Sequence, residues 1–280
     1  MPSMQEIQAR IESVGVTRQI ARAMQLVSNT KIRRCRELVG GSRLYFEENL
    51  KLLNTVVRAS AGLGSTFEQR EAPALYLVAG SDRGLCGGYN INVCKLAHSL
   101  MQQEPHGAEL MALGSRAQEF FARRSFPLRR SFRGISQNPF YLDGREVADA
   151  VLALFRSGEI GKVVLVYTVF ETILNHRPTA ITLLPLTRSA PEGPMVRMEP
   201  PEEALLEALL PDYLTGCIFC ALAEGALCEQ SARATSMDSA VKNCEELIDD
   251  MYMQYNIARQ GAITQEINEI VSGAEAQQGP

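Results

Sequence analysis

The final quarter of the chain carries an uninterrupted heptad repeat. Its members follow one another at alternating steps of four and three: Met237, Val241, Cys244, Ile248, Met251, Tyr255, Ala258 and Ala262. Residues at this spacing form one seam along a left-handed coiled coil. Within residues 205–273 only Pro211 would disturb a helix. A helix starting at Tyr213 would be on the order of 90 Å long. No domain of this size has a core that wide, so we expect the helix to extend beyond the core.

The beginning of the chain carries a second helical pattern. Apolar residues recur there at mostly three- and four-residue steps: Ile7, Ile11, Val14, Ile20, Met24 and Val27. No proline interrupts residues 3–72. Gly40 and Gly41 are the weak point, because each glycine costs about 1 kcal/mol relative to alanine in a helix. Antiparallel pairing of the N- and C-terminal helices buries both apolar stripes. We therefore predict a long antiparallel coiled coil.

The middle of the chain changes period. Short apolar runs at Ala74–Ala79, 110–113 and 163–167 alternate with helical stretches at 91–103, 116–124 and 145–156. This order is typical of an α/β domain with a largely parallel sheet. A further run at 179–186 reads as a strand at an edge or in antiparallel orientation. Prolines 191, 194, 200 and 201 mark a linker.

The predicted fold class is therefore α/β, with a central Rossmann-like α/β domain and the coiled coil. We divide the chain into an N-terminal coiled-coil helix (1–60), a central α/β domain (70–200) and a C-terminal coiled-coil helix (205–276).

Composition restricts the classes of partner. Apolar residues make up 46% of the chain, enough for a folded core. The net charge of −4 argues against binding nucleic acid through overall charge. No unbroken apolar run reaches the length of a membrane-spanning helix, so we expect no direct membrane insertion. The seven scattered cysteines suit reduced thiols inside a cell.

Four motifs, in order along the chain, resemble one family. They are RQIARAMQLVSNTKIRR at 18–34, SDRGLCGGYN at 81–90, RPTAITLLPL at 177–186 and YNIARQGAITQEINEIVSG at 255–273. Together they resemble the F-type ATP synthase gamma subunits from about residue 4 to residue 276. The family register of Thr17, Ile20, Ala23 and Met24 begins one residue before the first motif and continues into it.

The resemblance implies a noncatalytic rotor subunit in the central stalk of a bacterial enzyme. Its partners would be the alpha3-beta3 catalytic hexamer, the epsilon subunit and the membrane ring of c subunits. It would couple proton flow through that ring to conformational cycling of the catalytic beta subunits, transmitting torque and regulating ATPase activity. The location implied is the cytoplasmic side of the bacterial plasma membrane, as a peripheral protein. No cofactor, metal or catalytic residue is expected.

The resemblance also assigns contact residues. Arg259 and Gln260 match the family's hydrogen-bonding catch to a beta-subunit loop, and Met24 lies where the family approaches the beta lever. Neighbouring polar positions of the same set are Thr264, Glu266 and Glu269. The apolar residues Ile267, Ile270 and Val271 would turn inside an apolar sleeve of the hexamer.

The chain departs from the family pattern at two positions. Gln25 stands where the family commonly has lysine, and Asp238 also replaces a usual lysine. The ion-pairing role of the first lysine is therefore not carried over.

The central signature comprises Asp82, Arg83, Gly84, Gly87 and Gly88. It follows a predicted strand and precedes a helix, as a phosphate-binding loop does, but neither phosphate-loop spacing fits. We interpret it as a structural turn whose glycines permit positive φ and close packing. Asp82 and Arg83 would meet a partner.

Other patterns leave alternatives open. An NAD-binding α/β oxidoreductase would use the glycine loop, and a coiled-coil adaptor would only dimerise. The Cys217 and Cys220 pair is interpreted as buried small residues, because no second pair or nearby histidine accompanies it. His98, His106 and His176 are interpreted as solvated surface groups. An arginine run without a series of stacking aromatics is interpreted as a solvated face or a contact to an acidic partner: Arg123, Arg124, Arg129, Arg130 and Arg133.

Overall fold

The computed structural model describes residues 3–59, 71–186 and 202–277. Its contacts divide the chain into two units, one of residues 1–27 and 234–280 (the coiled-coil unit) and one of residues 28–233 (the sheet unit). Helix α1 (Met4–Ala59) and helix α5 (Glu202–Gln277) contribute to both units. The linker expected around prolines 191, 194, 200 and 201 lies outside the described residues.

The sheet unit contains one five-stranded sheet in the order β3-β2-β1-β4-β5. The strands are β1 (Ala74–Ala79), β2 (Ala108–Leu113), β3 (Leu128–Phe132), β4 (Lys162–Phe170) and β5 (His176–Leu184). All neighbours pair in parallel except β4 and β5, which are antiparallel. The expected edge position and antiparallel orientation of β5 are confirmed. The sequence reading missed β3, because this edge strand is mostly exposed and reads as part of the arginine run.

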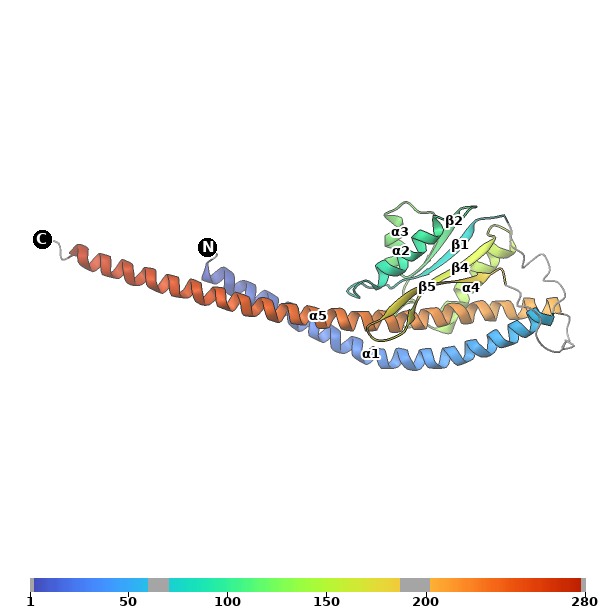
Figure 1. Ribbon diagram of the computed structural model, residues 1–280, viewed down its shortest axis with the longest axis horizontal. Helices are drawn as coiled ribbons and strands as arrows, with labels where there is room; N and C mark the ends of the chain where they lie inside the picture. The colour runs from blue at the N-terminus through green and yellow to red at the C-terminus, as the bar shows by residue number, and fades with distance from the viewer. Residues whose placement is uncertain (1–2, 60–70, 187–201, 278–280) are drawn as a thin grey trace. The chain divides into compact units, whose positions relative to one another are not determined.

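Three further helices and the long ones cover both faces of the sheet (Figure 1). Helices α2 (Tyr89–Met101) and α3 (Ser115–Ala122) pack on one face, where Tyr76 and Val78 of β1 point. Helix α4 (Tyr141–Arg156) and parts of α1 and α5 pack on the other face, against Leu75 and Leu77. Strand β1 is buried on both sides, which explains its continuous apolar run.

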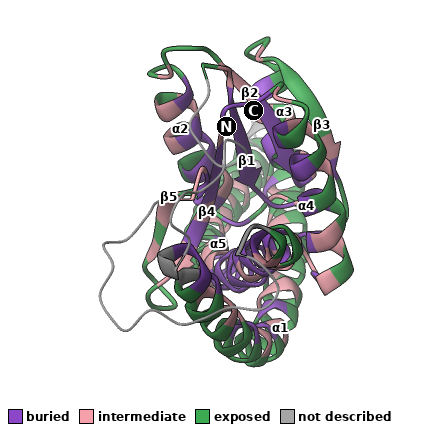
Figure 2. Cartoon of the chain, turned by 90° about the vertical axis from the view of Figure 1, so that its right-hand side faces the viewer, coloured by how far each residue is buried: buried purple, intermediate pink, exposed green. Residues whose placement is uncertain are grey.

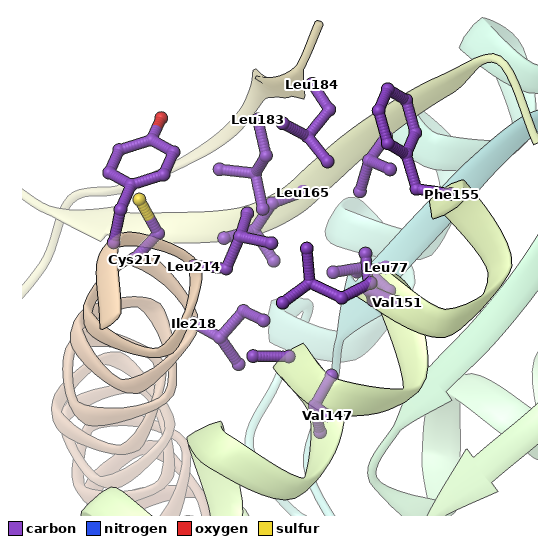
Figure 3. Close-up of a cluster of buried hydrophobic side chains, with 14 of the residues drawn as sticks. Leu77, Val147, Val151, Phe155, Leu165, Leu183, Leu184, Leu214, Cys217 and Ile218 are labelled. Carbon is purple, nitrogen blue, oxygen red and sulfur yellow. The ribbon is translucent and has the colours of Figure 1, made fainter. Parts of the chain in front are cut away.

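Helix α5 supplies much of the second core layer. Leu214, Cys217 and Ile218 meet Val151 of α4 and Leu77 of β1 in a close-packed cluster (Figure 3). Figure 2 shows buried turns of α5 beside the buried strands, and every residue of α5 from 221 to 231 is buried.

Part of α5 is long and apolar enough to cross a membrane by length and composition alone. Half of that window is buried inside the protein, and packing against the sheet explains this apolar character. The helix also continues through Pro211, whose carbonyl accepts a 2.7 Å hydrogen bond from the Thr215 hydroxyl.

The coiled-coil unit pairs α1 and α5 in antiparallel orientation and confirms the predicted fold class. On α5 the first four heptad residues are buried and the last four are half-buried, whereas the residues between them from 242 to 261 are exposed. On α1 of this unit the buried and half-buried residues follow the same alternating steps, at Ile7, Ile11, Val14, Arg18, Ala21 and Gln25, and the next step falls on Ser28, the buried first residue of the sheet unit. The sequence reading was wrong for Ile20 and Val27, which are exposed. Ala21 and Ser28, which are buried, lie beside them in the sequence and continue the seam. A pattern of large apolar residues does not reveal small residues of this kind.

Candidate partner-binding site

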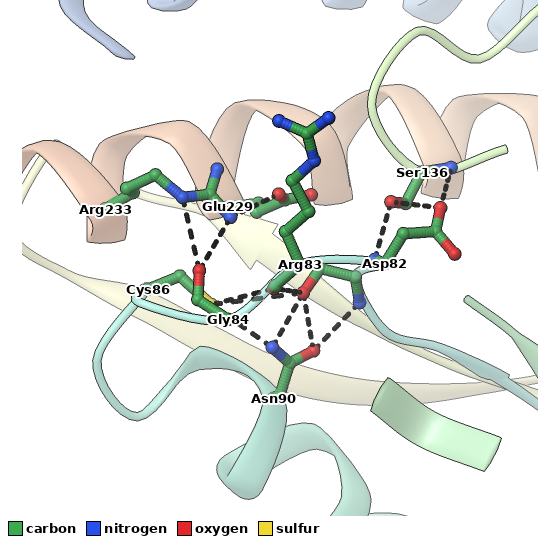
Figure 4. A network of polar contacts seen from close by, with 9 residues as sticks. Asp82, Arg83, Gly84, Cys86, Asn90, Ser136, Glu229 and Arg233 are labelled. Atoms are coloured by element: carbon green, nitrogen blue, oxygen red, sulfur yellow. Dashed lines mark hydrogen bonds and ion pairs between the residues drawn. The ribbon is translucent and has the colours of Figure 1, made fainter. Parts of the chain in front are cut away.

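The loop between β1 and α2 contains the central signature and is held by a network of polar contacts (Figure 4). Asn90 at the start of α2 accepts a hydrogen bond from the Ser81 amide at 2.8 Å. Its own amide group donates to the Ser81 hydroxyl at 2.7 Å and to the Cys86 sulfur at 3.1 Å. The Ser81 hydroxyl donates in turn to the Arg83 carbonyl at 2.6 Å. The loop therefore has one preferred backbone path.

Asp82 connects this loop to two others. Its Oδ1 accepts hydrogen bonds from the backbone and hydroxyl of Ser115, both at 3.0 Å. Its Oδ2 accepts from the backbone of Ser136 at 3.2 Å and from the Ser136 hydroxyl at 2.8 Å. Burial alone would raise the pKa of Asp82, but hydrogen bonds from Gly134, Ser136 and Ser115 hold it below its usual value.

The position of Asp82 bears on the nucleotide-binding alternative. Ligands of open α/β sheets bind at the carboxyl ends of the strands, where helix N-termini offer N–H donors to phosphate. Ser115 begins α3 at this edge, and its N–H donates to the Asp82 carboxylate. Part of the donor set at this edge, at Ser115 and Ser136, is thus occupied by a carboxylate of the chain itself. This arrangement favours the structural-turn interpretation of the signature.

The signature glycines have different roles. Gly87 has a φ of +55°, which glycine adopts without strain. Gly88 has an ordinary negative φ, and its Cβ would lie 3.1 Å from the Asn92 side chain. A Cβ on Gly84 would lie 3.3 Å from the Arg116 guanidinium. Positive φ is therefore needed at Gly87, whereas Gly84 and Gly88 allow close approach.

Two side chains of the loop face outward. Arg83 is exposed, and Figure 4 shows its side chain leading away from the loop while Asp82 turns toward Ser136. Leu85 is 62% exposed and has a φ of +61°, which is unusual for a residue with a Cβ. The structure thus separates the two charged residues of the signature, since Asp82 is bonded within the chain and Arg83 faces solvent.

The predicted contact residues near the C-terminus all lie on the exposed surface of α5. They are Arg259, Gln260, Thr264, Glu266 and Glu269. The Thr264 hydroxyl donates to the Gln260 carbonyl at 2.9 Å, and Glu269 accepts from Gln265 at 3.0 Å. These bonds join residues of one helix turn. The side chains of Arg259 and Gln260 are exposed, as expected from their positions beside the seam.

The heptad seam ends before the helix does. After Ala262 every described side chain up to Gly273 is exposed, including Ile263, Ile267, Ile270 and Val271. Ile267 and Ile270 are 54% and 71% exposed. Residues 263, 267 and 270 follow the spacing of one helix face. Contiguous apolar exposure of this kind marks an interaction surface.

The N-terminal contact residue has a different environment. Met24 packs against a small cluster of Ala21, Met237 and Val241 in the coiled-coil unit. It is half-buried, so only part of its side chain can meet another protein.

The two departures from the family pattern contact each other. The Gln25 amide donates to Asp238 Oδ1 at 2.9 Å, across the pair of helices. Asp238 Oδ2 also accepts from Lys242 at 2.8 Å, one turn further along α5. Hydrogen bonds from Lys242, and a weaker one from Gln25, lower the pKa of Asp238. The two positions at which the resemblance leads us to expect lysine thus form a hydrogen-bonded pair.

The environment of the cysteine pair disfavours the thiolate form. Burial raises the pKa of Cys217 to about 12 and that of Cys220 to about 11. At neutral pH these thiols are protonated and poor nucleophiles. Within the described ranges of the chain, no group of three or more His, Cys, Asp or Glu side chains could hold a metal ion.

The interpretation of the histidines was wrong in two cases. His98 is half-buried between the rings of Phe121 and Phe126. His176 is half-buried against Phe170, and burial lowers its pKa. Only His106 is exposed as expected. Isolated sequence positions do not reveal such aromatic contacts.

Most of the arginine run is used within the chain. Arg129 pairs with Glu109 and Glu159, and Arg130 pairs with Glu146. Arg124 lies over the ring of Phe120, and Arg133 donates to Gln118. Arg129 and Arg130 place charge on the edge strand β3, which discourages pairing with another strand.

Three residues of the loop region were not identified from the sequence. Leu85 lies inside the signature, but its positive φ has no sequence signal. Glu229 and Arg233 form a buried ion pair on α5, and Arg233 reaches the loop. Their i, i+4 spacing is the only available clue, and this spacing is common on exposed helices.

Comparison with known proteins places these features in context. A model of the ATP synthase family matches residues 3–277. The ATP synthase gamma chain of Desulforamulus reducens is 38% identical over 282 residues, covering 99% of each chain. That of Alkaliphilus metalliredigens is 37% identical over 284 residues, covering 98% of each. The sodium-ion-specific gamma chain of Acetobacterium woodii is 36% identical over 298 residues, also covering 98% of each.

Solved structures share the fold. A chain in the OSCP/F1/c-ring structure of the Euglena gracilis mitochondrial ATP synthase matches with a TM-score of 0.70 and 18% identity, covering 98% of this chain and 94% of that chain. A chain of the Tetrahymena thermophila central stalk and c-ring structure matches with a TM-score of 0.63 and 20% identity, covering 79% and 99%. At these identities the likeness concerns the fold alone.

Proposed function

The chain belongs to the ATP synthase gamma chain family, and from this we propose that it is the noncatalytic rotor of the central stalk. It would couple ion flow through a membrane ring of c subunits to conformational cycling of an alpha3-beta3 hexamer. A rotor that presents a different face to each beta subunit shifts the conformational equilibrium of each site in turn. The epsilon subunit would be a further partner.

One observation of the structure carries this proposal. The C-terminal part of α5 extends beyond its own seam with an exposed apolar face at Ile263, Ile267 and Ile270. Apolar residues gathered on an exposed helix face are typical of a surface that another protein covers. An apolar contact without fixed ion pairs suits a surface that must turn against its partner.

The polar contacts fall at two places. Arg259 and Gln260 face outward on α5, with Thr264, Glu266 and Glu269 beyond them. The exposed Arg83 would contribute a cation from the loop of the sheet unit. Met24 would contribute from α1. The bonded carboxylate of Asp82 would fix the loop instead of meeting the partner.

The location and the coupling ion belong to the same proposal. As part of a membrane-bound complex, the chain would lie on the cytoplasmic side of a bacterial membrane as a peripheral subunit. Similarity does not select the ion, because a relative named sodium ion specific is 36% identical and relatives without an ion in their names are 37% and 38% identical.

Reconstitution tests the proposal. We expect the full chain to copurify with coexpressed alpha and beta subunits and, with delta, epsilon and the membrane sector, to restore ATPase activity coupled to ion pumping. The chain alone should hydrolyse no ATP. Failure to copurify with the hexamer would contradict the proposal. Micromolar binding of NAD in calorimetry would favour the oxidoreductase, and stable homodimers without affinity for the hexamer would favour the adaptor.

A paired substitution tests the catch. Arg259→Ala with Gln260→Ala should weaken coupled ATP synthesis in membranes and leave the circular dichroism spectrum and thermal unfolding unchanged, because both side chains are exposed. Asn268→Ala, another exposed change on the same helix, is the control. Unchanged synthesis by the pair would show that this catch is not used.

A further inference from the structure

Arg233 of α5 binds the backbone of the signature loop. Its Nη2 and Nε donate to the Gly84 carbonyl at 3.1 and 3.3 Å, and Nη2 also donates to Glu229 Oε1 at 2.7 Å. The side chains of Arg233 and Glu229 are 8% and 1% exposed. The second carboxylate oxygen of Glu229 has no hydrogen-bond partner in the described part of the chain. Arg233 is therefore the group that binds this carboxylate.

The bound carbonyl belongs to an unusual peptide. The Gly84 carbonyl leads directly into Leu85, whose φ of +61° is left-handed. A residue with a Cβ is strained in this conformation, because the Cβ lies too close to the following carbonyl oxygen. Leu85 gains little burial in return, since its side chain is 62% exposed. Such a conformation persists only where the surrounding structure enforces it.

We infer that Arg233 is a positioning residue, which holds the Gly84–Leu85 peptide so that Leu85 stays left-handed with its side chain exposed beside Arg83. Glu229 is its counter-ion and fixes the guanidinium on the helix. Lysine could not replace it fully, because its ammonium has one nitrogen and cannot present two nitrogens in a fixed plane to the Gly84 carbonyl, as the guanidinium does. The conformational role stands on these contacts, while its consequence for a partner rests on the proposed function.

Hydrogen exchange of the isolated full chain tests the conformational role. Arg233→Gln should accelerate exchange of the loop amides at 84–88 by about tenfold, the effect of releasing a strained left-handed residue. Arg233→Lys should accelerate it less. Glu229→Gln should also accelerate it, because the buried guanidinium loses its counter-ion. The Lys variant keeps the test valid if the Gln variants fold poorly.

A second substitution separates positioning from simple packing. Leu85→Gly accepts positive φ without strain, so in the Arg233→Gln background it should restore most of the protection of the neighbouring loop amides. Leu85→Ala removes the same exposed side chain but keeps the strain, and should restore none. Equal loop exchange in wild type and Arg233→Gln would overturn the inference. So would acceleration that spreads along α5 and that Leu85→Gly does not reverse.

Assembly measurements separate this inference from the proposed function. If the contact of Arg233 with the Gly84 carbonyl orders a partner-binding surface, Arg233→Lys should weaken coupling in the reconstituted complex. Leu85→Ala should weaken coupling without any change in α5. Altered loop exchange with normal coupling would retain the conformational role but remove this loop from the partner contact. Failure of the wild-type chain to bind the hexamer would overturn the proposed function alone.

Discussion

Single residues of the signature loop act mainly through backbone geometry. The Asp82 carboxylate accepts hydrogen bonds from Ser115 and Ser136, and it joins the loops that follow β1, β2 and β3. Leu85 and Arg83 are left facing solvent. The charge in this signature therefore serves two purposes, one inside the fold and one at the surface.

Asp82→Asn should lower the free energy of unfolding by about 1.5–3 kcal/mol at pH 7, the range for hydrogen bonds to a charged group. The folded pKa of Asp82 is lowered, so its stabilisation is present above the unfolded pKa of about 3.9 and disappears as pH falls through the folded pKa. Urea unfolding at pH 7 and in acid checks this. Asp149→Asn, an exposed partner of Arg145, should cost under about 1 kcal/mol.

The pair of Gln25 and Asp238 gives a second prediction for single residues. Because each side chain has the other as a partner, Gln25→Ala and Asp238→Ala should not be additive, and the double variant should be less destabilised than the sum of the singles. Thermal unfolding of the four chains measures this. Asp238→Ala should lower the unfolding temperature somewhat more than Gln25→Ala, since it also removes the ion pair with Lys242. Additive effects would show that the two departures are independent.

At the level of elements, the two long helices change their surroundings along their length. In the sheet unit α5 is buried against strands and helices, and all of its residues from 221 to 231 are buried. In the coiled-coil unit only one seam remains buried. The seam is where helix pairing derives its stability, because isolated helices gain little from propensity alone.

Neighbouring residues of α5 test that statement. Ile248 lies in the seam and is 8% exposed, whereas Leu247 is 52% exposed. Ile248→Ala should destabilise the chain by about 2 kcal/mol or more. Leu247→Ala should stay within about 0.5 kcal/mol. Urea unfolding followed by circular dichroism at the helical band distinguishes them, and equal losses would mean that the seam does not stabilise the pair.

For the whole molecule, the exposed end of α5 is the feature that the fold itself does not explain. Every residue of α5 from 263 to 273 is exposed in the described part of the chain. Stability of the isolated protein cannot be the reason for apolar residues there. Assembly is the property to which they should contribute.

Ile267→Ser with Ile270→Ser should therefore leave thermal unfolding of the isolated chain nearly unchanged and weaken its binding to the hexamer by about tenfold or more. This estimate takes about 0.8 kcal/mol for each buried CH₂ group that is lost. Sedimentation of the assembled complex measures the binding. Asn268→Ser is the matched polar control on the same turn. Equal binding by both variants would contradict an apolar contact at this end.

Local periodicity determined the fold class from the sequence alone. The heptad repeat predicted the α5 seam residue by residue, and the alternation of apolar runs predicted four of the strands. The heptad repeat and the apolar runs can both be recognised in the sequence, because each follows from the geometry of a single helix or strand. The ordered motifs indicated the family, which full-length similarity then established. The domain limits at 1–60, 70–200 and 205–276 and the partner contacts stay predictions.

Only the tertiary structure decided which residues meet across long distances in the chain. It brought Asp82 to Ser136, Gln25 to Asp238 and Arg233 to Gly84. It also moved the α1 seam onto Ala21 and Ser28 and added the exposed edge strand β3. No local period encodes such contacts, because each depends on the path of the backbone between the two residues and on the burial of both.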